Sequence, residues 1–103
     1  MTKGYWIAAV DVIDPEGYKA YVAANAVAFA LYAGRFLIRG AVPEVPEGHT
    51  RARLVVIEFP SLQAATDCYH SPEYAAAMAH RLGKSVIDLA IVAGYDGAQP
   101  GQG

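Results

Sequence analysis

The residues with the clearest chemical potential are three polar side chains within otherwise apolar segments. Asn25 lies in an aromatic and apolar helical stripe, Arg39 ends the run "RFLIR", and Glu58 nearly ends the run "RLVVIEF". Arg39 could bind a carboxylate or enolate oxygen, Asn25 could orient such a ligand, and Glu58 could fix Arg39 or act as a general base. The alternative is structural, with Arg39 and Glu58 as an ion pair and Asn25 bonded to nearby backbone. The strand register that decides between them cannot be read from the sequence.

The stretch "CYHSPEYAA" gathers the other candidate groups. His70 beside two helix ends could transfer a proton or bind a ligand, with Tyr69 and Tyr74 as pocket walls. The alternative for His70 is a loop residue without a chemical role. Ser71 precedes Pro and Glu, which predicts a helix cap instead of a nucleophile. Cys68 is predicted to be a small buried apolar residue instead of a reactive thiolate.

No metal or cofactor is predicted. The three histidines and the single cysteine are dispersed and show no metal-ligand spacing,. The chain also lacks a glycine-rich phosphate-binding loop.

Composition and charge argue against several classes of partner. The net charge is −2 and the eight Lys and Arg residues are scattered, so nucleic-acid binding has no support,. No apolar stretch approaches the roughly 20 residues of a membrane span, and the N-terminal apolar run is too short for a signal peptide. The single cysteine suits a reducing compartment, so a cytoplasmic location is expected,.

The elements that must position the candidate residues follow from periodicity and from Pro, Gly and capping residues. Asp14 and Pro15 open the longest helix, and Gly34 stands where the chain must leave it,. The predicted strands are 5–12, 35–39, 53–59 and 86–95, and the predicted helices are 14–34, 61–70 and 71–83.

This order predicts an α+β, ferredoxin-like βαββαβ fold, in which the helices cover one face of a four-stranded antiparallel sheet. A right-handed crossover makes the first two strands parallel, with the third between them. We expect a single domain over residues 1–97 and a disordered tail over 98–103,.

The strands predict a second copy of the chain. The runs "YWIAAV", "LVVI" and "LAIVA" are almost continuously apolar, which is typical of strands buried on both faces,. The helices can cover only one face, so we expect a homodimer in which two sheets pack into a dimeric α+β barrel. Trp6, Val55 and Ile57 are predicted to lie on the face that the partner covers.

The segments "DVIDPEGYKAYVAANAVAFALYAGRFLIRGA", "RLVVIEFPS", "CYHSPEYAAA" and "GYDG" resemble, as an ordered set, the domain-of-unknown-function 1330 family. The resemblance extends from Lys3 to about Gly97. It implies a ferredoxin-like chain in a dimeric α+β barrel, a mainly bacterial source and no established reaction. It also implies a set of pattern residues: Asn25, Arg39, Gly40, Glu58, Phe59, Tyr69, Ser71 and Tyr74.

Two functions follow as hypotheses. The first is a dimeric protein that binds, and could transform, a small anionic or carbonyl-containing organic molecule between sheet and helices. In it Arg39 binds the anion, Asn25 orients it, and Glu58 or His70 moves a proton. The second is a non-catalytic binding or stress-related module in which the polar residues satisfy one another.

Overall fold

The computed structural model describes residues 2–101 and contains every element that the sequence predicts. In chain order the elements are β1 (Gly4–Val12), α1 (Pro15–Leu31), β2 (Arg35–Ala41), β3 (Arg53–Phe59), α2 (Leu62–Tyr69), α3 (Pro72–Ala79) and β4 (Ser85–Ala93).

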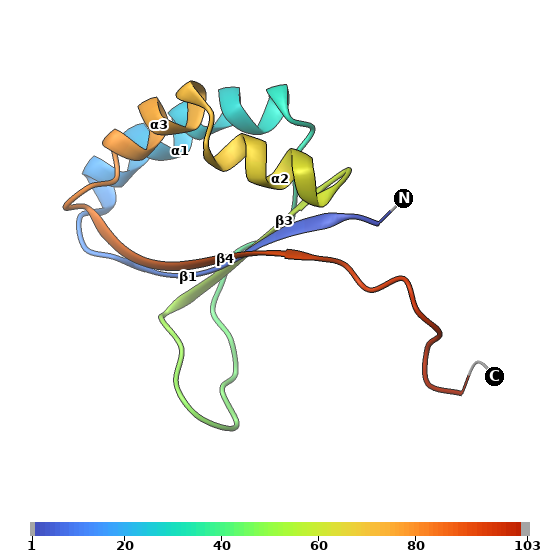
Figure 1. The fold of residues 1–103 in the computed structure, drawn as a ribbon. Helices are drawn as coiled ribbons and strands as arrows, with labels where there is room; N and C mark the ends of the chain where they lie inside the picture. The colour runs from blue at the N-terminus through green and yellow to red at the C-terminus, as the bar shows by residue number, and fades with distance from the viewer. Residues whose placement is uncertain (1, 102–103) are drawn as a thin grey trace.

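The strands form one four-stranded sheet in the order β2-β3-β1-β4, and all neighbouring strands are antiparallel. β3 therefore separates β1 from β2, and β1 and β2 run in the same direction, as predicted. All three helices lie on one face of the sheet, while the β2–β3 connection and the C-terminal segment extend from the other side (Figure 1). The predicted ferredoxin-like α+β fold is confirmed.

Side-chain caps set where the helices begin. Asp14 Oδ1 accepts a hydrogen bond from the backbone N–H of Gly17 at 3.1 Å. Ser61 and Ser71 cap α2 and α3 in the same way, each accepting a backbone N–H bond at 3.0 Å. Each bond satisfies a donor that the first helical turn leaves free. The role predicted for Ser71 is confirmed.

Two adjacent residues shape the end of α1. Ala33, not Gly34, takes the left-handed conformation, with φ of 58°. The backbone N–H of Gly34 bonds back to Phe29 O at 2.8 Å, which closes a Schellman motif,. Gly34 is required by packing instead, because an added Cβ would stand 2.8 Å from Cε1 of Phe59.

The core lies between the helices and the sheet, with Trp6 at its centre. Trp6 is 2% exposed and donates from Nε1 to Ala65 O at 2.8 Å, which ties β1 to α2. Phe29, Phe59 and Tyr74 pack around its indole with ring centroids 4.9–5.4 Å away. Aromatic contacts of this kind add to the free energy gained by burial.

The prediction for the open face of the sheet was wrong about which residues form it. Trp6 and Ile57 pair across β1 and β3 and are buried under the helices, and Val55 packs against the same core. Side chains alternate between the two faces of a strand, so either the odd-numbered or the even-numbered residues face the helices. Because both sets are apolar here, the sequence does not show which set does. The open face instead carries Ile7 and Val56, which pair with each other.

None of the helices among residues 2–101 is long and apolar enough to cross a membrane. The cytoplasmic location stays a prediction. The division into a domain over 1–97 and a tail over 98–103 also stays a prediction, and residues 1, 102 and 103 lie outside the described residues.

Candidate functional site

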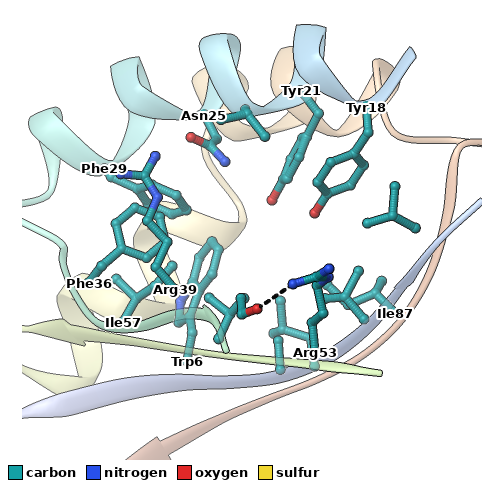
Figure 2. A pocket seen from close by; sticks show the side chains of 17 residues that line it. Trp6, Tyr18, Tyr21, Asn25, Phe29, Phe36, Arg39, Arg53, Ile57 and Ile87 are labelled. Atoms are coloured by element: carbon teal, nitrogen blue, oxygen red, sulfur yellow. Dashed lines mark hydrogen bonds between the residues drawn. The ribbon is translucent and has the colours of Figure 1, made fainter. Parts of the chain in front are cut away.

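A cavity of about 330 Å³ lies between α1 and the helix-covered face of the sheet. Its size is at the lower end of the range for small-molecule sites. Figure 2 shows α1 along one side and the strands along the other. The lining is mostly apolar and aromatic, and its polar members are Tyr18, Tyr21, Asn25, Arg39 and Arg53.

Asn25 is placed where the helical stripe predicts, on the sheet-facing side of α1. It lines the cavity and is only 5% exposed. Its Oδ1 is buried and has no hydrogen-bond partner among the described residues. The alternative in which nearby backbone satisfies this oxygen therefore does not apply, and a buried acceptor without a donor costs free energy.

Arg39 also lines the cavity, although simple alternation along β2 assigns it to the face of Leu37. The pairing with β3 shifts between Phe36 and Ile38, so Leu37 is an extra residue in a β-bulge,. This shift puts Arg39 on the face of Phe36, and its guanidinium lies over that ring, 4.2 Å from the centroid. A cation held on an aromatic face is partly ordered before any ligand arrives.

Arg53 is a cavity residue that sequence reasoning missed. Its Nη1 donates to Gly40 O at 3.0 Å, beside the second irregularity of the β2–β3 pairing, where Gly40 has φ of 81°. The signal was present in the sequence. Arg53, Val55 and Ile57 alternate along one strand, so a charged residue at 53 shares their face.

The charged side chains that line the cavity are all positive. Arg39 and Arg53 are both exposed residues, so they stand at its mouth, and neither forms an ion pair with a carboxylate among residues 2–101. No Asp or Glu belongs to its lining. Two uncompensated guanidinium groups beside an apolar space favour an anion there.

Two tyrosines of α1, Tyr18 and Tyr21, were also missed. Both line the cavity (Figure 2). Burial raises the pKa of each phenol, so both stay protonated at neutral pH,. The hydroxyl of Tyr21 is hydrogen-bonded to that of Tyr74 at 2.7 Å. Tyr74, predicted as a pocket wall, is fully buried behind Tyr21 and does not itself line the cavity.

Glu58 does not join the cavity. It pairs with Tyr5 across β1 and β3, on the open face of the sheet. Its Oε1 accepts from Arg35 Nε and its Oε2 from the Tyr5 hydroxyl, both at 3.1 Å. The hydrogen bond to Glu58 raises the pKa of Tyr5. The expected ion pair with Arg39 is thus replaced by one with Arg35, because Arg39 lies on the opposite face.

His70 and Tyr69 also lie outside the cavity lining. His70 is exposed and forms the C-cap of α2, where its backbone N–H bonds to Thr66 O. Tyr69 is half-buried, with its ring against Trp6 and Tyr74. The catalytic roles predicted for Glu58 and His70 stay predictions.

Cys68 is fully buried, as predicted. Burial raises the pKa of its thiol to about 12, so the reactive thiolate does not form at neutral pH,. Within residues 2–101, no three His, Cys, Asp or Glu side chains are grouped to hold a metal ion.

Comparison with known sequences decides the family. The family described as "Domain of unknown function (DUF1330)" matches residues 3–95. The chain belongs to this family. The match spans β1 to β4 and includes all the residues that line the cavity of this DUF1330 chain. No curated protein matches the sequence.

Solved structures share the fold at low sequence identity. The RPA0582 protein of unknown function from Rhodopseudomonas palustris is 20% identical with a TM-score of 0.69, over 88% of this chain and 81% of that one. SnoaB, a cofactor-independent oxygenase from Streptomyces nogalater, is 15% identical with a TM-score of 0.61, over 96% of both chains. A dimeric ferredoxin-like protein of unknown function from Bacteroides fragilis is 15% identical with a TM-score of 0.53, over 87% of this chain and 94% of that one. These similarities establish the fold alone.

Proposed function

We propose that this DUF1330 chain binds a small organic anion, or a carbonyl compound that carries partial negative charge on oxygen, in the cavity between α1 and the sheet. The observation that supports the proposal is the pair Arg39 and Arg53, which face an apolar cavity of about 330 Å³ without a carboxylate partner. An arginine that served only the fold would gain from a carboxylate neighbour, and the described residues provide neither side chain with one.

Binding is better supported than acid–base catalysis. The lining contains no His, Cys, Asp or Glu, and its titratable phenols have raised pKa values. A general base needs a group that accepts a proton near neutral pH within reach of the ligand. Ligand binding without a chemical step is therefore the favoured form of the proposal. The oxygenase activity named for SnoaB belongs to a chain only 15% identical.

Calorimetric titration with 2-naphthoate and with its neutral methyl ester tests the charge requirement. We expect the wild type to bind the acid more tightly, and Arg39→Gln or Arg53→Gln to weaken acid binding about tenfold while leaving ester binding unchanged. Lys19→Gln is the matched control, because it removes one positive charge outside the cavity lining. Equal affinity for acid and ester, or no binding of either, would contradict the proposal.

We also propose that two copies pair through the open face of the sheet, which would complete an α+β barrel. Four aliphatic side chains on that face are 40–49% exposed: Ile7, Ile38, Val86 and Val92. They form an apolar surface that a second identical sheet could cover. The Bacteroides fragilis protein of the same fold is described as dimeric, which supports this arrangement.

A further inference from the structure

We infer that the ligand of this cavity is a planar aromatic acid that carries a hydrogen-bond donor, either a hydroxyl or an N–H group, which is given to Asn25 Oδ1. The inference rests on the proposed function, since it takes anion binding at Arg39 and Arg53 as its starting point. It adds the shape of the ligand body and the position of one further polar group.

The side-chain oxygen of Asn25 is buried and, among residues 2–101, unpaired. A buried acceptor without a donor is costly, and native proteins keep few of them. None of the cavity's own donors reaches it: Oδ1 forms no hydrogen bond with the Arg39 or Arg53 guanidinium or with the Tyr18 hydroxyl. The Tyr21 hydroxyl is paired with that of Tyr74. A donor on the molecule that enters the cavity would satisfy Oδ1.

The walls of the cavity are rich in aromatic side chains. One end of the cavity is lined by Trp6 of β1, Phe29 of α1 and Phe36 of β2, and the other end by Tyr18 and Tyr21 of α1 (Figure 2). Aromatic surfaces favour a flat aromatic body over a flexible aliphatic one, because ring contacts add to simple burial and cost little conformational entropy.

The polar groups of the cavity differ in the ligand groups that they can bind. Donors of the arginines can take the carboxylate, but the amide oxygen of Asn25 repels an anion and accepts only from O–H or N–H. A site built to pair with a ligand hydroxyl discriminates strongly against the analogue that lacks it, because the protein group is then left unpaired. Asn25 is thus a residue that determines specificity, while the arginines supply the affinity common to all acids.

The experiment compares 2-naphthoate with its 3-, 6- and 7-hydroxy derivatives and with the corresponding methoxy derivatives, by calorimetric titration of the full chain. We expect at least one hydroxy acid to bind about tenfold more tightly than both the parent acid and its methoxy analogue. The position of the favoured hydroxyl reports the distance from the arginines to Asn25.

Asn25→Leu and Asn25→Ala are the decisive variants. We expect both to lose the preference, so that the hydroxy acid and 2-naphthoate bind to each variant with equal affinity. Gln63→Leu is the matched control, because it removes an exposed amide on α2 that is bonded to Asp67. Melting temperatures no lower than that of the wild type establish that the Asn25 variants are folded, and the pair of variants guards against a fold defect in either one.

The outcomes separate the two proposals. If all acids bind equally in the wild type, or if the preference survives in both Asn25 variants, the inference is overturned while anion binding stands. If no acid binds, the proposed function fails and the inference fails with it.

Discussion

The two faces of the sheet differ in which side chains have partners and which are covered. Under the helices, Arg39 and Arg53 have no carboxylate partner among residues 2–101 and the Asn25 side-chain oxygen has no donor there, while the aromatic core is covered. On the open face, Glu58 is bonded to Arg35 and Tyr5, while aliphatic side chains are left exposed.

The same contrast continues at the other end of the open face. Arg51 bonds to Asp11 at 3.0 Å and to Asp88 at 2.9 Å, which ties the β2–β3 connection to β1 and β4. Paired charges beside exposed aliphatic groups suit a protein interface, where unpaired charge is costly. Unpaired polar groups beside an apolar cavity suit a small ligand. The difference supports both proposals, association through the open face and small-molecule binding under the helices.

The largest expected effect on stability comes from truncating an isoleucine to alanine, once on each face of the sheet. Ile57 is 3% exposed under the helices and Ile7 is 49% exposed on the open face. We expect Ile57→Ala to lower the free energy of unfolding by about 2–5 kcal/mol, because it leaves a cavity in the core. Ile7→Ala should cost clearly less at protein concentrations where the chain is monomeric. Urea titration measures both, and equal losses would remove the distinction between the faces.

The next effect concerns association. Ile7→Glu places a charge on the apolar surface where we propose the second copy to sit, and it has no cation opposite in the described chain. We expect the dimer dissociation constant to rise about a hundredfold or more, because an uncompensated charge is buried at the interface. Sedimentation velocity over a concentration series measures the change. A wild type that is monomeric at all concentrations, or a variant that associates as well as the wild type, would refute the proposed dimer.

A smaller effect, of opposite sign, is expected at Asn25. Replacing it by Leu removes a buried acceptor that has no donor, so the ligand-free protein should gain about 1 kcal/mol in free energy of unfolding. Stability gained by removing a binding group is the usual trade-off at functional sites. Thermal and urea unfolding without ligand measure it. A clear loss of stability would mean that the amide is held by contacts within the fold.

The sequence predicts the elements and their order well, because capping residues, Pro and apolar periodicity act locally. Ser71 and Asp14 are examples, since each bonds within its own helix start. The cavity is less predictable because it depends on strand register. One β-bulge at Leu37 decides that Arg39 faces the helices, and the pairing of Glu58 with Tyr5 decides that Glu58 does not. Arg53 was within reach of simple alternation, whereas the unpaired state of Asn25 Oδ1 depends on tertiary contacts.

The smallest effect is a pH dependence confined to the open face. Asp11 Oδ1 accepts from the backbone N–H of Ala52 at 2.8 Å, and this bond, followed by that from Arg51, lowers the pKa of the Asp11 carboxyl. A lowered folded-state pKa contributes stability that is present above the ordinary value and lost as the pH falls through the lowered one. The start of β3 should therefore loosen only below about pH 4.

Amide proton chemical shifts and exchange at Ala52, followed by NMR between neutral and acid pH, measure this loosening. The amide of Ala64 is the internal control, because it bonds to the Ser61 hydroxyl at 3.0 Å and that acceptor does not titrate. Asp11→Asn should abolish the pH dependence at Ala52 and leave the behaviour of Ala64 unchanged. If Ala52 and Ala64 respond alike, the open-face charges do not anchor the connection, and the contrast between the faces reduces to their apolar residues.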